Sequence, residues 1–144
     1  QRWIMGVRLY AEGARHDLIK IPAGGSRHPT TAQSVRDRLH AIRMKGGSLY
    51  RIAIKRMAQA VTELLKEFGV GVEDLGQVIF HQANGRLLTA VCDRLGLPRD
   101  KMFTSVEHCG NTSSASLPIA LDGAVRSGAC IPGTWCCSAP SAAV

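Results

Sequence analysis

The sequence lacks the features of a membrane-spanning, secreted or disordered protein. No apolar run approaches the roughly 18 residues that cross a bilayer, and residues 1–10 contain no small-residue cleavage site of a secretory signal. Aromatic residues make up only 5% of the chain, yet 45% of its residues are hydrophobic, as in a globular protein with a core. We therefore expect a soluble, cytoplasmic protein with no membrane partner.

The sequence also lacks the cysteine and histidine spacings of a metal site. Its five cysteines are an odd number, and no Cys-x-x-Cys pair occurs among them. Without a secretory signal, an odd number of cysteines favours reduced thiols. We expect no bound metal ion.

Acidic residues are scarce in this chain. It has 11 Asp and Glu against 18 Lys and Arg, a net charge of +7, and the basic residues are concentrated in 27–45 and 51–56. Such an excess favours a polyanionic partner, which could be nucleic acid, a phosphate-bearing cofactor or an acidic protein, unless it is an ordinary solvated surface. Nucleic acid is the weakest of these options, because no basic motif is interleaved with aromatic residues.

Strand-like and helix-like segments alternate along the chain, separated by Gly and Pro. We expect strands at 2–10, 18–22, 77–80 and 102–106, a weakly helical stretch at 31–44, and helices at 49–68, 84–95 and 117–128. The alternation predicts an α/β fold, a mixed sheet with helices packed on both faces. The first residue is Gln, and the strand-like start indicates a piece of a longer protein.

Two polar residues, His81 and Asn111, each lie between an expected strand and an expected helix. In open α/β sheets, ligands gather where strands end and helices begin. If the two strands are neighbours, the imidazole and the carboxamide could both donate hydrogen bonds to one developing oxyanion. The competing interpretation is that each side chain simply caps the helix that follows it.

Four segments, in the same order, resemble a known enzyme family. They are "IPAGGSRHP" at 21–29, "MKGGSLYRIA" at 44–53, "HQANGRLL" at 81–88 and "GNTSSASLPIAL" at 110–121. Together they resemble β-ketoacyl-acyl-carrier-protein synthase III, a thiolase-fold condensing enzyme, over residues 2–128. The resemblance implies the C-terminal half of a thiolase-like fold. It divides the chain into the end of the N-terminal half with a basic connection (1–45), the C-terminal domain (46–128) and a tail (129–144).

The resemblance implies decarboxylating Claisen condensation by a Cys-His-Asn triad, in fatty-acid or polyketide initiation. The family cysteine takes an acyl group from acyl-CoA, and the His and Asn then polarise the thioester of malonyl-acyl-carrier protein as CO2 leaves. By resemblance, His81 and Asn111 are the second and third triad members. No tightly bound cofactor is implied; acyl-CoA and the phosphopantetheine arm of the carrier protein are substrates, and the intact enzyme would be a homodimer.

Further residues are carried over from the family by position. Asn84 matches an asparagine beside the pantetheine arm, and it could also cap the following helix. Gly46 and Gly47 match the lining of the cofactor tunnel. Three arginines match positions that present basic residues to the acidic carrier protein: Arg86, Arg51 and Arg94. For Arg51 and Arg94, a solvated surface is the competing interpretation.

The family nucleophile lies in the N-terminal half, so the resemblance leaves it outside these residues. Cys109 precedes a turn instead of starting a buried helix, where a thiolate would be favoured. Cys92 falls in the middle of an expected helix and should be core or boundary packing. We therefore expect this chain alone to be inactive in condensation.

The tail "ACIPGTWCCSAPSAAV" departs from the family, which has a Gly-Asp-Leu-Val-Leu-Leu strand and a Phe-Gly-Gly-Gly loop there. A one-base shift of GC-rich codons for this tail restores that family segment, so we hypothesise a frameshift product, which the coding DNA would test. Because Pro132 and Pro140 suit a central strand poorly, residues 129–144 are expected to be loose, or a strand only briefly.

Two alternatives remain open at this point. One is another thiolase-superfamily acyltransferase, such as a polyketide starter or ester-forming synthase. The other is a non-catalytic half that only binds carrier protein or CoA.

Overall fold

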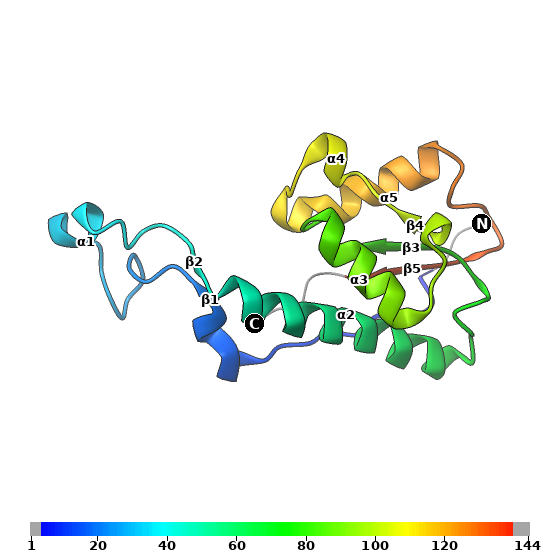
Figure 1. The fold of residues 1–144 in the computed structure, drawn as a ribbon, viewed down its shortest axis with the longest axis horizontal. Helices are drawn as coiled ribbons and strands as arrows, with labels where there is room; N and C mark the ends of the chain where they lie inside the picture. Colours follow the sequence, from blue (N-terminus) through cyan, green and yellow to red (C-terminus); the bar gives the residue numbers. More distant parts are fainter. Residues whose placement is uncertain (1–3, 140–144) are drawn as a thin grey trace. The chain divides into compact units, whose positions relative to one another are not determined.

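The computed structural model describes residues 4–139 of the chain (Figure 1). Residues 1–3 and 140–144, with the parts of the expected first strand and of the tail that fall on them, lie outside the described residues. The chain forms two compact units: Gln1–Leu9 with Ala53–Ala142, called here the core unit, and Tyr10–Ile52 with Ala143–Val144, called the basic unit. The expected divisions after residues 45 and 128 stay predictions.

A three-stranded parallel sheet lies at the centre of the core unit. Its strands are β4 (Met102–Phe103), β3 (Leu75–Phe80) and β5 (Trp135–Ala139), in the order β4-β3-β5. Every residue from 77 to 80 is buried. A strand buried at consecutive positions must be covered on both faces of its sheet, as is typical of parallel sheets.

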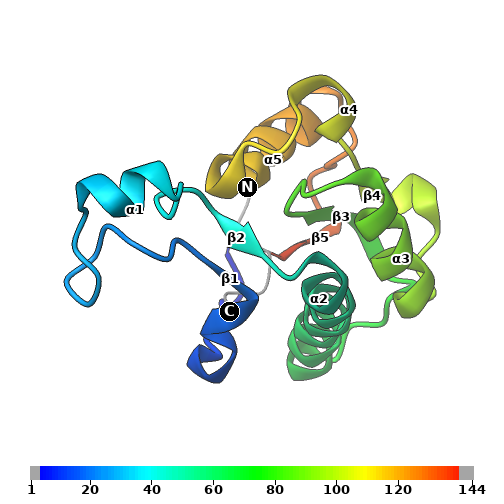
Figure 2. The ribbon, with the colours of Figure 1, turned by 60° about the vertical axis from the view of Figure 1, so that its left-hand side comes forward.

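Three helices provide that cover. In α2 (Gly46–Phe68), α3 (Gly85–Leu95) and α5 (Ser116–Arg126), the buried residues recur at helical spacing, for example Ala53, Met57 and Val61. On α5, Ala120 and Ala124 pack against Ile79 of β3. Both ribbon views place α2 and α5 on opposite sides of the sheet (Figures 1 and 2). The predicted α/β fold is confirmed.

The basic unit contains short elements and little core. It consists of η1 (Gly13–Leu18), β1 (Ile19–Lys20), α1 (Ala32–Arg36) and β2 (Arg43–Met44), which pairs antiparallel with β1. Thr31 and Ser34 cap α1 with reciprocal hydrogen bonds. Ala23 is the one buried residue within the stretch 10–52, all of which the structure describes.

Three sequence predictions about strands need correction. Residues 4–10, expected to be a strand, have no regular secondary structure, because none of the strands in the described part of the chain pairs with them. The strand expected at 102–106 stops at Phe103, and Val106–Cys109 is a helical turn, α4. Within the tail, which was expected to be loose or only briefly a strand, residues 135–139 form β5.

Side chains explain why β5 forms. Its burial alternates, with Cys137 and Ala139 inward, as a half-covered edge strand requires. Five residues pair in parallel with β3, with an irregularity between Leu75 and Gln77. Trp135 lies beside Phe68 of α2, with ring centroids 6.4 Å apart. Thus the tail supplies an edge strand rather than a central one.

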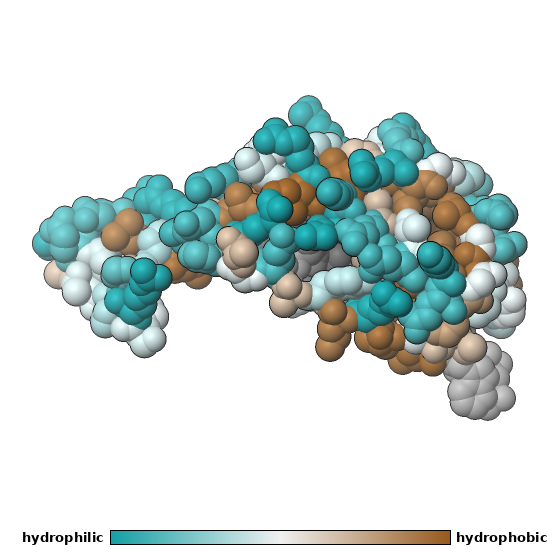
Figure 3. All heavy atoms as spheres, turned by 90° about the horizontal axis from the view of Figure 1, so that it is seen from below, coloured by the Kyte–Doolittle hydropathy of each residue, from teal (hydrophilic) through white to brown (hydrophobic). Residues whose placement is uncertain are grey.

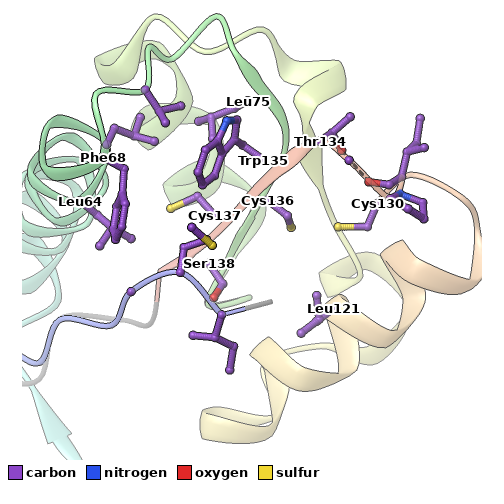
Figure 4. Close-up of a pocket in the computed structure, with 18 of the residues that line it drawn as sticks. Leu64, Phe68, Leu75, Leu121, Cys130, Thr134, Trp135, Cys136, Cys137 and Ser138 are labelled. Atoms are coloured by element: carbon purple, nitrogen blue, oxygen red, sulfur yellow. Dashed lines mark hydrogen bonds between the residues drawn. The ribbon is translucent and has the colours of Figure 1, made fainter. Parts of the chain in front are cut away.

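The core unit also carries an open apolar cavity of about 650 Å³. Residues 4–7, the end of α2 and the segment 130–138 line it, with Phe68, Leu121 and Trp135 among its walls (Figure 4). Further apolar side chains are exposed, including Ile4, Val7 and Ile131. Apolar patches interrupt the polar surface on the face drawn in Figure 3. No helix among the described residues is long and apolar enough to cross a membrane.

Candidate active site

His81 follows the last residue of β3. Its backbone N–H donates to the carbonyl of Ala139, the end of β5, at 3.0 Å, so both strands hold it. The ring is half-buried, and its Nδ1 lies 2.6 Å from Oγ of Ser116 at the start of α5. Burial lowers the pKa of His81, and a hydrogen bond with the Ser113 backbone acts in the opposite direction. A lowered pKa favours a neutral imidazole at neutral pH.

Asn111 lies in a turn with unusual backbone geometry. Gly110 has φ 66°, and Ser113, which is not a glycine, has φ 56°. Oδ1 of Asn111 accepts a hydrogen bond from the Ser113 N–H at 2.9 Å. This contact identifies the amide oxygen and leaves the Nδ2 hydrogens to donate elsewhere. Asn111 therefore stabilises its own turn and does not cap α5, whose N-cap residue is Ala115.

One segment, residues 113–116, holds both side chains. Asn111 is fixed to the backbone of Ser113, and His81 contacts Ser116 and the Ser113 backbone. The two polar residues predicted from the sequence are thus brought to the same short segment, at the carboxyl end of β3. Their route there differs from the prediction, because α4 intervenes between β4 and Asn111.

Gln82 was missed by the sequence analysis, although it organises this end of the sheet. It is fully buried. Its Oε1 accepts hydrogen bonds from the N–H groups of Ser105 and Val106, at 2.8 and 3.2 Å. Its Nε2 donates to the carbonyls of Phe80 and Phe103, at 2.8 and 3.5 Å. Because Gln82 takes up the N–H groups just after β4, the chain turns there into α4.

Ser116 was also missed, and it too is buried. Besides contacting His81, its Oγ accepts a hydrogen bond from the Gln82 N–H at 3.1 Å. Sequence signals for both residues exist. Gln82 continues the inward alternation of Val78 and Phe80, and Ser116 continues the buried stripe of Ala120 and Ala124 at intervals of four.

The remaining predicted residues lie on two helices. Asn84 caps α3, accepting a hydrogen bond from the Leu87 N–H at 2.9 Å, which confirms its predicted capping role. Arg86 and Arg94 are exposed on α3. The other three are exposed in the first turns of α2 within the basic unit: Gly46, Gly47 and Arg51. The contacts predicted for these residues with substrate or carrier protein stay predictions.

The cysteines offer no activated thiolate in the core. Burial raises the pKa of Cys92 to about 11 and that of Cys137 to about 11, so both are thiols at neutral pH. Cys109 is exposed and ends α4, instead of starting a helix. Among residues 4–139, no three His, Cys, Asp or Glu side chains are grouped closely enough to hold a metal ion.

Known proteins share this sequence and fold. The family model for the C-terminal part of 3-oxoacyl-[acyl-carrier-protein] synthase III matches residues 65–139. The chain is 41% identical to the beta-ketoacyl-[acyl-carrier-protein] synthase III of Erythrobacter litoralis over 130 residues, which is 90% of this chain and 38% of that protein. The synthase III of Desulfitobacterium hafniense is 38% identical over 86% of this chain, and the chain again spans 38% of it.

Solved structures agree with the sequence comparisons. The synthase III of Aquifex aeolicus superposes with a TM-score of 0.78 at 34% identity, covering 94% of this chain and 39% of that one. A priming β-ketosynthase from the R1128 polyketide pathway gives a TM-score of 0.64 at 38% identity, over 72% of this chain and 32% of that one. On sequence and fold together, the chain belongs to the 3-oxoacyl-[acyl-carrier-protein] synthase III family and corresponds to its C-terminal part.

Proposed function

We propose that this chain supplies the decarboxylating half of the active site in a condensing acyltransferase. The complete enzyme would join an acyl-CoA-derived primer to malonyl-acyl-carrier protein and release a 3-oxoacyl-acyl-carrier protein. The observation that carries the proposal is the common anchoring of His81 and Asn111 on residues 113–116, which leaves the Asn111 amide hydrogens available. Neutral donors suit this reaction because they add no charge that must be desolvated.

In the proposed reaction, the bond between the malonyl methylene and its carboxylate breaks and CO2 leaves. The electron pair stays on the substrate as a thioester enolate, whose oxygen accepts hydrogen bonds from His81 and Asn111. Donors already fixed in place stabilise such charge without reorganisation. The enolate carbon then attacks the acyl-thioester carbon, and the cysteine thiolate departs as the leaving group.

The nucleophilic cysteine of this reaction would belong to the rest of the intact protein. The chain spans about 38% of the length of the curated relatives it matches. Its buried cysteines are protonated thiols, which supports a nucleophile outside this chain. The chain alone would therefore release no condensation product.

Substrate binding would use residues at the helix starts and on exposed surfaces. Asn84, Gly46 and Gly47 would line the path of the pantetheine arm, with no tightly bound cofactor. Arg86, Arg51 and Arg94 would face the carrier protein, since exposed arginines attract an acidic partner and raise its encounter rate. The intact protein would work as a homodimer in the cytoplasm.

A chimera tests the proposal directly. Residues 10–139 would replace the matching part of the Aquifex aeolicus synthase, and release of CO2 and of 3-oxoacyl product would be measured. We expect activity that falls by about 100-fold or more in His81→Ala, because one oxyanion donor is lost. His108→Ala, an exposed histidine on α4, is the matched control and should leave both rates unchanged. Equal rates in His81→Ala, or steady acyl transfer by the isolated chain, would contradict the proposal.

A second candidate is a starter synthase of a polyketide pathway. The 38% identity to the R1128 priming ketosynthase favours it as an alternative. An ester-forming acyltransferase, or a half that only binds carrier protein or CoA, belongs to the same test. The product released by the active chimera from different acyl primers separates these possibilities, and a chimera that binds carrier protein without releasing CO2 indicates the non-catalytic one.

A further inference from the structure

Ser116 occupies a position that no part of the predicted triad explains. It is the first residue of α5, and its side chain is 1% exposed. Its Oγ lies 2.6 Å from Nδ1 of His81 and 3.1 Å from the backbone nitrogen of Gln82. One hydroxyl therefore contacts both residues that follow β3.

The direction of these hydrogen bonds follows from counting donors and acceptors. A serine hydroxyl has one hydrogen to donate and two lone pairs. The Gln82 N–H can only donate, so it uses a lone pair of the Ser116 oxygen. The hydroxyl hydrogen still needs an acceptor, because buried polar groups are almost always paired. Within residues 4–139, the acceptor that the structure offers this hydroxyl is Nδ1 of His81.

We propose that Ser116 is a positioning residue that donates its hydroxyl hydrogen to Nδ1 of His81 and so places the imidazole proton on Nε2. A neutral imidazole carries one proton, and the partner of one nitrogen decides where that proton resides. With Nδ1 accepting from Ser116, Nε2–H becomes the donor of the ring. That this donor faces the enolate rests on the proposed function, whereas the proton's location does not.

The same contact also fixes the angle of the ring. The Ser116 oxygen is held by the Gln82 N–H, and Gln82 is held in turn by four hydrogen bonds to the ends of β3 and β4. Rotation of the imidazole would break a short hydrogen bond to a buried and immobilised partner. Ser116 thereby couples the orientation of His81 to the sheet.

Nuclear magnetic resonance of the ¹⁵N-histidine-labelled 144-residue chain tests the assignment without any activity assay. Long-range proton–nitrogen correlations identify which nitrogen of His81 is protonated, with His81→Gln assigning the signals. We expect a protonated Nε2 and an Nδ1 resonance shifted upfield by the accepted hydrogen bond. In Ser116→Ala, Nδ1 should move to the frequency of an imine nitrogen without a hydrogen bond. Ser127→Ala, at the other end of α5, should leave it unmoved.

Two results would overturn the proposal. One is a wild-type ring protonated on Nδ1, which would then donate to Ser116 or to the Ser113 backbone. The other is an Nδ1 resonance that does not move in a folded Ser116→Ala chain. The first result needs no variant, so it decides even if Ser116→Ala fails to fold.

In the chimera, Ser116→Ala should lower kcat with little change in KM, because substrate binding is not its role. Ser116→Thr keeps the hydroxyl and should recover part of that loss. If the resonances behave as expected but the chimera is inactive, the proposed function fails and the role of Ser116 in setting the tautomer stands.

Discussion

His81 combines a partly buried ring with a strand end that two hydrogen-bond networks hold. Burial lowers its pKa below the ordinary value of 6.5. In the unfolded chain the ring is solvated and titrates near that value, so between the two pKa values the unfolded state binds more protons. The free energy of unfolding must then rise with pH across this window.

The pH dependence can be isolated by comparing two proteins. Urea unfolding would be measured from about pH 7.5 down to about pH 5, for wild type and for His81→Gln. We expect wild type to lose stability relative to the variant as the pH falls through 6.5 towards the folded pKa. A difference that stays constant across the range would contradict a lowered pKa.

Asn111 allows its two functions to be separated. In Asn111→Asp, a side-chain oxygen can still accept from the Ser113 N–H, so the turn should persist, but the amide donor is lost. We expect decarboxylation in the chimera to fall by about 100-fold or more, with an unchanged thermal midpoint. Asn111→Ala should lose both activity and some stability. Full activity in the Asp variant would show that the Nδ2 donor is not used.

At the residue scale, the sequence was informative about chemistry and silent about support. His81 and Asn111 stand at junctions that patterns can locate, and Asn84 has the side chain of a helix cap. Ser116, in contrast, is one of several hydroxyl residues in "NTSSAS". Its importance comes from contacts with residues 34 and 35 positions away, which no local pattern contains.

At the scale of elements, two glutamines near the sheet offer a matched comparison. Gln82 makes four hydrogen bonds between the ends of β3 and β4. Gln77, also buried, has an Oε1 with no partner among the described residues. Gln82→Leu should lower the free energy of unfolding by about 3 kcal/mol or more, because buried N–H groups lose their acceptor.

Gln77→Leu should change stability by no more than about 1 kcal/mol, in either direction, because it removes an unpaired polar atom from the core. Chemical denaturation of both variants provides the measurement. Similar losses in the two variants would argue against the bridging role of Gln82.

The ends of β4 and the tail show why element boundaries escaped the sequence analysis. β4 ends early because a side chain from β3, not a neighbouring strand, binds the next N–H groups. β5 forms from residues with little apolar bulk because the ladder with β3 uses the backbone, whatever the side chains are. Gly76 helps, since a Cβ there would lie 2.7 Å from Oγ1 of Thr134, just before β5.

At the scale of the whole molecule, burial is distributed unequally between the two units. The basic unit buries one alanine in residues 10–52, and it contains most of the clustered arginines. Segments with so few buried contacts open at low free-energy cost and are cleaved first by proteases. The core unit has a sheet covered on both faces and should open far less readily.

Limited trypsin digestion followed by mass spectrometry checks this difference. We expect early cleavage after Arg27, Arg36 or Arg38, and survival of a fragment that contains residues 53–139. Arg94 is the internal control, because it is equally exposed but lies on α3, which packs against the core. Cleavage after Arg94 as early as after Arg27 would contradict the difference in local stability.

The neighbourhood of Trp135 and Phe68 also has an optical consequence. The chain contains two tryptophans, and one of them begins the strand that holds the backbone of His81 through Ala139. A Trp3→Phe chain would carry a single emitting indole at that strand. Its emission colour and its quenching by iodide would then report, in real time, whether the last strand is docked when a substrate or a missing part of the enzyme is added.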